Sequence, residues 1–235
     1  MTGTHATGEA RLIRGQALSG LVFGAFLAIH LANTIAGAFG EEAYNRFMAA
    51  ARGWYQIAPV EILGVGLSAL AHGYYGIRRA LRRRARRRSG AADAAPGWLR
   101  LHRASGWVLL LVIVGHVAAT RGPALLEDLP AEFSLLRFSL ESWPLLMWPY
   151  YFLLFSAGTY HLLHGGLIAL NVIGVRTGAP TARWARALLL AALLAGSAGV
   201  LSMGGVWGEA DNSNYAAYRD IYERYAPLLA NLARW

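Results

Sequence analysis

Four histidines lie inside four consecutive apolar segments of the sequence, one in each: His30, His72, His116 and His161. Successive histidines are 42, 44 and 45 residues apart, which is about one membrane crossing plus one loop. A histidine in a hydrocarbon environment is costly and is usually functional. Four of them at regular depth, one per helix, are typical of two imidazole pairs that face each other across a helical bundle and hold haem iron.

Five apolar runs are long enough to carry these histidines through a membrane. Of the 235 residues, 56% are hydrophobic and only 15% are charged, whereas a soluble domain has about a quarter charged residues. Each run has between 17 and 29 residues, which is long enough to cross a hydrocarbon core that takes ~20 residues. The runs are residues 16–38, 58–77, 104–120, 146–174 and 185–206. The sequence therefore predicts an all-α integral membrane protein with five transmembrane helices, the first four forming a haem-binding bundle.

The placement of arginine predicts the orientation. All 22 basic residues are arginines, and eight of them lie between Arg78 and Arg88, in the loop after the second run. Because basic loops stay in the cytoplasm, we expect the N-terminus inside and the C-terminus outside. A basic loop between two membrane segments favours contact with anionic lipid or an acidic partner over nucleic acid. Residues 1–206 are expected to form one transmembrane dihaem domain, and residues 207–235 a polar, aromatic tail on the outer side.

Depth in the membrane predicts which histidines pair. His30 and His116 each follow a Ser-Gly pair by about three helical turns, which places both in the outer half. His72 lies close to the basic loop and hence to the inner boundary. His30 should therefore pair with His116 at an outer haem, and His72 with a histidine of the fourth segment at an inner haem. Depth mildly favours His164 there, but a repeated His-x3-Gly pattern favours His161, which we choose.

Five further residues are candidates for binding or catalysis. Arg14, Ser19, Arg103 and Ser105 lie near the inner end and are candidate partners of haem propionates. Each has a simpler alternative, because arginines anchor the inner ends of helices and small serines pack between them. Glu61 is the carboxylate best placed to enter a membrane segment. It is predicted either to accept a proton during quinol oxidation near the outer haem or to be a solvated residue at a helix end.

The absence of cysteine limits the redox chemistry of the chain. A covalent haem attachment and a cysteine-ligated iron–sulfur cluster both need thiols, so two non-covalent b haems are expected. There is also no glycine-rich dinucleotide fingerprint. Any electron transfer through this chain is therefore expected to serve partner proteins.

The motifs together resemble the dihaem cytochrome b subunit of succinate:quinone oxidoreductases and quinol:fumarate reductases, of the single-chain, five-helix kind. The resemblance covers about residues 8–206 and rests on the order and spacing of several short motifs. These are Ser19-Gly20 to His30-Leu31, Glu42-Ala43-Tyr44-Asn45, Glu61, His72 to Gly76, Arg103 to Gly106, His116-Val117 and Tyr160-His161-x3-Gly165. The long polar tail departs from the family pattern, as does the lack of an arginine after Gly165.

The resemblance implies that the four histidines are axial ligands, with the distal haem held by the first and third helices. It implies a flavoprotein subunit and an iron–sulfur subunit on the cytoplasmic side of a bacterial inner membrane. This multi-pass subunit would then carry electrons to or from menaquinone or ubiquinone, while the partners perform the dicarboxylate chemistry. A dimer of such complexes is compatible with the pattern. Two alternatives stay open: a stand-alone b561-like dihaem electron carrier, and a haem-free transporter whose histidines relay protons.

Overall fold

The computed structural model describes residues 2–90, 94–129 and 131–232, and within this part of the chain the regular elements are all helices, with no strand. The predicted all-α class is confirmed. In chain order the elements are α1 Thr2–Ala36, a 3₁₀ turn Gly37–Phe39, α2 Glu41–Tyr55, a π-helical stretch Val60–Leu67, α3 Ser68–Arg88, α4 Gly97–Leu126, α5 Phe133–Ser142, α6 Pro144–Val172, α7 Arg183–Met203 and α8 Tyr215–Leu232.

Four helices are long and apolar enough to cross a membrane, and a fifth crossing is available. The four segments are Gly8–Phe39, Gly97–Leu126, Pro144–Val172 and Arg183–Met203. The fifth candidate joins α2 to the continuous helix Val60–Arg88, with a bend of 98° between them. The expected second run, residues 58–77, coincides with the apolar first half of that continuous helix. The structure thus has four candidate membrane-spanning helices, or five if the bent pair counts as one.

The bend has a local cause. Proline has a fixed φ and no amide hydrogen, so it is favoured where a new helix starts. Pro59 directly precedes the π-helical stretch, with φ −62° and ψ −37°. At its other end, α2 begins after Gly40, whose φ of 98° suits glycine. Its first turn carries Glu41 and Glu42, which favour the positive end of a helix.

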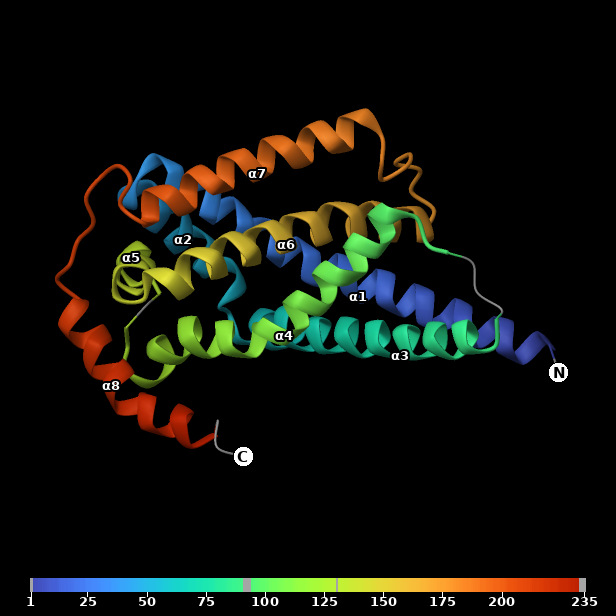
Figure 1. The fold of residues 1–235 in the computed structure, drawn as a ribbon, viewed down its shortest axis with the longest axis horizontal. Helices are drawn as coiled ribbons and strands as arrows, with labels where there is room; N and C mark the ends of the chain where they lie inside the picture. The colour runs from blue at the N-terminus through green and yellow to red at the C-terminus, as the bar shows by residue number, and fades with distance from the viewer. Residues whose placement is uncertain (1, 91–93, 130, 233–235) are drawn as a thin grey trace.

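The helices that carry the four histidines form the centre of the bundle. Helix α1 packs against α3 and against α6, α4 packs on α6, and α7 covers α6 and α1 (Figure 1). Helices α3 and α4 meet through a long side chain: Leu110 Cδ1 would lie 3.7 Å from a Cβ atom built at Gly73. The arginine-rich end of α3 lies at the same end of the bundle as the N-terminus (Figure 1).

Three short helices cover the opposite end of the bundle, where α2, α5 and α8 gather (Figure 1). Their apolar side chains form two clusters, one around Phe133 and Leu140 and the other around Leu135, Phe138 and Tyr218. Tyr218 of α8 is only 1% exposed, and its hydroxyl lies 3.1 Å from the hydroxyl of a serine on α5. The polar, aromatic tail therefore contains a helix, and this helix packs onto α5.

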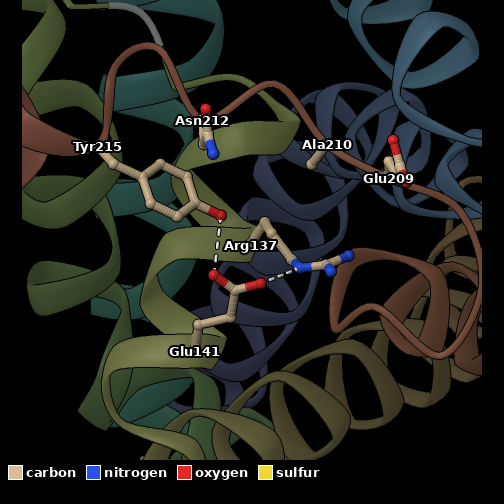
Figure 2. A pocket seen from close by; sticks show the side chains of 6 residues that line it. All are labelled: Arg137, Glu141, Glu209, Ala210, Asn212 and Tyr215. Carbon is tan, nitrogen blue, oxygen red and sulfur yellow. Dashed lines mark hydrogen bonds and ion pairs between the residues drawn. The ribbon is translucent and has the colours of Figure 1, made fainter.

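A polar cavity of about 260 Å³ lies where α5, α8 and the segment before α8 meet (Figure 2). Arg137 and Tyr215 both reach Glu141 there: the arginine forms an ion pair with the carboxylate, and the Tyr215 hydroxyl donates to Oε2 at 3.1 Å. Burial, together with this bond to a carboxylate, raises the pKa of Tyr215 to about 12. These contacts attach the first residue of α8 to α5.

Candidate functional site

The four predicted histidines form two pairs inside the bundle. His30 of α1 and His116 of α4 have ring centroids 5.7 Å apart. His72 of α3 and His161 of α6 have ring centroids 6.0 Å apart. The ring planes are inclined by 75° and 84° in the two pairs. The structure thus brings His30 close to His116, as depth predicts, and His72 close to His161, the partner chosen from the repeated His-x3-Gly pattern.

His164, the alternative to His161, does not form a pair with His72. It is buried, and its Nδ1 atom lies 3.2 Å from the carbonyl oxygen of Tyr160. Its ring stacks on Tyr160 at 4.0 Å and on Trp98 at 6.2 Å. Of the two candidates on α6, the structure places His161 opposite His72.

We name His30 and His116 the outer pair and His72 and His161 the inner pair, after the levels predicted for them. Backbone carbonyls orient the inner pair. His72 Nδ1 lies 3.1 Å from the carbonyl oxygen of Gln16, and His161 Nδ1 lies 3.1 Å from that of His102. An Nδ1–H group that donates to a carbonyl settles the tautomer, so that Nε2 is left with a free lone pair. This is the arrangement that a metal-binding imidazole needs.

The two serines predicted to contact propionates lie in the same backbone turns. Ser19 Oγ donates to carbonyl oxygens of the preceding turn at 2.7 and 3.3 Å. Ser105 Oγ donates to the carbonyl of His102 at 2.8 Å and also lies 3.3 Å from His161 Nδ1. Both hydroxyls therefore support the turn that orients an inner histidine, a role that the sequence analysis did not predict.

The glycine after each serine makes room for an imidazole. A Cβ atom built at Gly20 would lie 2.7 Å from two ring atoms of His72. One built at Gly106 would lie 2.8 Å from Cε1 of His161. These distances are too short for carbon–carbon contact, so any side chain would displace the ring. The repeated Ser-Gly pattern thus has a steric cause at the inner pair.

His102 is a further residue at the inner pair. Its ring stacks on His161 with centroids 4.3 Å apart and planes 16° apart. Gly165 accommodates it, because a Cβ atom there would lie 2.9 Å from Cε1 of His102. Neither His102 nor Gln16 is among the site residues chosen from the sequence. The one available signal was that each stands three residues before a repeated Ser-Gly pair.

Aromatic side chains surround the outer pair. His116 Nδ1 lies 3.1 Å from the hydroxyl of Tyr150 on α6. His30 stacks on Phe26 at 5.7 Å, and Phe26 meets Tyr55 edge to face at 5.1 Å. His116 of the outer pair thus has a phenolic hydroxyl beside Nδ1, whereas both histidines of the inner pair have a backbone carbonyl there, which Ser105 Oγ supplements at His161.

Glu61 forms an ion pair with an arginine. Arg121 of α4 donates from Nε to Oε1 at 2.7 Å and from Nη2 to Oε2 at 3.0 Å. Both side chains are partly buried, and Glu61 lies in the π-helical stretch, a type of irregularity that is frequent at functional sites. Because both carboxylate oxygens are occupied, a proton-accepting role would require this pair to open.

The arginines at the end of the bundle that carries the N-terminus differ in their surroundings. Arg14 is exposed on α1, and Arg103 is half-buried on α4. Arg79 contacts the interior instead: its Nη1 donates to the side-chain oxygen of Gln16 at 2.6 Å, and its Nε lies 3.9 Å from Glu9. Arg79 therefore joins the basic end of α3 to the turn that orients His72.

The two histidine pairs fit six-coordinate haem iron. Metal–imidazole bonds are about 2 Å long, so two imidazoles on opposite sides of one iron have ring centres roughly 6 Å apart. The observed values of 5.7 and 6.0 Å agree with this spacing. No three His, Asp or Glu side chains of the described residues gather as a metal-ion site, but axial ligation of haem needs only two imidazoles.

Comparisons of the chain with protein-family models, with curated proteins and with solved structures give no match. Its function is therefore argued from the paired histidines and their surroundings.

Proposed function

We propose that this chain is the membrane-anchor cytochrome b subunit of a succinate dehydrogenase or fumarate reductase complex. In this role it carries electrons between an iron–sulfur subunit and membrane quinone through two b haems. The observation that carries the proposal is the presence of two histidine pairs at two levels of one apolar helical bundle, with ring centroids 5.7 and 6.0 Å apart within the pairs. Neutral imidazoles on facing helices are the usual way in which a bundle holds haem.

Each histidine has a defined task in this proposal. His30 and His116 would hold the outer haem, and His72 and His161 the inner one. When bound, haem supplies reversible one-electron transfer. The backbone carbonyls that accept from Nδ1 of the inner histidines keep Nε2 directed away from them, and this second contact also raises the basicity of the ligand. Gly20 lets the inner histidine of the neighbouring helix approach the backbone.

The charge distribution supports the proposed orientation and partners. The arginine-rich end of α3 and the N-terminus lie at one end of the bundle, which we assign to the cytoplasm of a bacterial cell (Figure 1). With the bent pair as the second crossing, the chain spans the inner membrane five times and ends outside. The basic end would receive a flavoprotein and an iron–sulfur subunit, because a chain without cysteine needs partners for the two-electron chemistry.

Quinone is proposed to react at the outer level, where Glu61 remains the candidate proton acceptor. Glu61 forms an ion pair with Arg121, so its carboxylate must separate from the guanidinium before it accepts a proton. Glu61→Gln should therefore slow quinone-linked turnover in the assembled complex. Unchanged turnover at all pH values would remove Glu61 from the mechanism.

The decisive experiment is isolation of the intact complex, followed by an optical spectrum, haem quantification and mass measurement. We expect a reducible b-type band, two haems per chain, and two larger partners of which one contains flavin. A lone dihaem protein would instead indicate a b561-like carrier. Freshly purified protein without any b-type band would refute the haem assignment and favour a transporter.

The ligand assignment on α6 has its own test. His161→Ala should lose one of the two haems, because it removes the imidazole that faces His72. His164→Ala is a matched control on the same helix and should keep both haems. Loss of a haem in the His164 variant alone would reverse the assignment.

A further inference from the structure

The two histidine pairs differ in what holds their Nδ1 atoms. At the inner pair, both Nδ1 atoms lie at 3.1 Å from backbone carbonyl oxygens, those of Gln16 and His102. At the outer pair, Nδ1 of His116 lies at 3.1 Å from the phenolic hydroxyl of Tyr150. A backbone carbonyl cannot be removed by substitution, but a phenol can. The outer pair therefore has a partner whose influence is open to measurement.

Tyr150 is placed for this contact by the same helix that supplies an inner histidine. It lies 11 residues before His161 on α6, which is about three turns, so both project from one face of the helix. Its ring does not stack on His116: the centroids are 6.5 Å apart and the planes are tilted by 40°. The contact is thus made through the hydroxyl. The neighbouring Tyr151 differs, because its hydroxyl lies 3.0 Å from Ser139 on α5.

We propose that Tyr150 is a positioning residue that orients His116 and tunes the reduction potential of the outer haem. The proposal rests on the proposed function. When Nε2 of His116 binds iron, Nδ1 carries the ring proton and donates it to the phenolic oxygen. A hydrogen bond at this second nitrogen makes the imidazole a stronger electron donor, which favours the oxidised iron. Tyr150 therefore lowers the potential of the outer haem relative to an unpartnered His116.

The test is a redox titration of the intact complex, read from the haem absorbance, in wild type and in Tyr150→Phe. The substitution removes one oxygen and keeps the ring, so both haems should remain bound. One of the two transitions should move to higher potential, with the reduction equilibrium changing by up to about tenfold, or ~59 mV for one electron. Tyr151→Phe is the control, and it should leave both transitions unchanged.

A second variant identifies the haem that moves. In a His161→Ala background the remaining haem is the outer one, and Tyr150→Phe should raise its potential there as well. Electron paramagnetic resonance of the oxidised complex should show a changed low-spin signal for the same haem, because the plane of His116 is no longer held. Unchanged potentials, equal shifts of both haems, or a downward shift would overturn the role of Tyr150 alone. Wild-type protein without b haem would overturn the proposed function and this inference together.

Discussion

In the proposed two-haem protein, replacing Gly20 by alanine is expected to weaken haem binding at the inner site and to leave the outer site filled. The new methyl group would lie 2.7 Å from Cε1 and Nδ1 of His72, whereas ordinary contact begins at about 3.4 Å. The imidazole would therefore have to move by roughly 0.7 Å. Its bond to the carbonyl of Gln16, now 3.1 Å long, would stretch toward the limit of hydrogen bonding.

The size of the effect follows from two costs. Overpacking of a closely packed site costs about 1–3 kcal/mol, and a lost hydrogen bond costs about 1 kcal/mol. Without haem the His72 ring is free to swing away from the methyl group, so most of this cost appears only when the ring must meet the iron. A total of about 2–4 kcal/mol corresponds to a roughly 30- to 700-fold weaker affinity.

The assay is haem content per chain after dilution and washing, together with the potential of each remaining haem. Gly73→Ala is the matched control, because it lies next to His72 and its new methyl group would meet its nearest neighbour at an ordinary 3.7 Å. It should keep both haems. If Gly20→Ala also keeps two haems, with the inner potential and the rate of haem loss unchanged, the steric argument for the repeated glycine is wrong.

Three further outcomes are expected. A double-mutant cycle of Arg121→Gln and Glu61→Gln, measured by thermal unfolding, should give a coupling energy of about 1 kcal/mol, because the ion pair is bidentate but partly exposed. Purely additive effects of the two substitutions would argue against the ion pair. The folded-state pKa of Tyr215 is raised to about 12, so its stabilising contribution should be complete below pH 10 and lost between pH 10 and 12. Hydrogen exchange of α8 should report this loss, and Tyr215→Phe should reduce it. Gly196→Ala should lower stability by about 1–3 kcal/mol in thermal unfolding, because its methyl group would lie 1.8 Å from the buried ring of Phe155; an unchanged midpoint would contradict the close packing of α6 and α7.

The helices and most of the histidine pairing could be predicted because the length of an apolar run indicates a crossing, and the position of a residue within the run gives its depth in the membrane. Hydrophobic length located the helices, and the distance of His72 from the basic loop separated it from His30. Depth alone mildly favoured His164 over His161, which lies about one helical turn away. Their difference is rotational: the ring of His164 turns toward Trp98, and that of His161 toward His72.

Contacts at the outer end could not be predicted in the same way. Tyr150 contacts His116, which lies 34 residues earlier in the sequence, and Arg121 contacts Glu61, which lies 60 residues earlier. Both contacts depend on the rotation of each helix about its axis and on the bend before α3, and an apolar run gives no information on either. The short helices α2 and α5 lie between the apolar runs, so hydrophobic length did not predict them.

The carbonyl contacts of the inner pair also bear on how such a site changes during evolution. Since the acceptor belongs to the main chain, the side chains at these two positions are free to diverge without loss of the bond. The chain already contains two such versions, with Gln16 in the first half and His102 in the second. The side chains make other contacts: Gln16 accepts a hydrogen bond from Arg79, and the ring of His102 stacks on His161. In relatives of this protein, the spacing of Ser, Gly and His should therefore be kept more strictly than the identity of the residue whose carbonyl accepts the hydrogen bond.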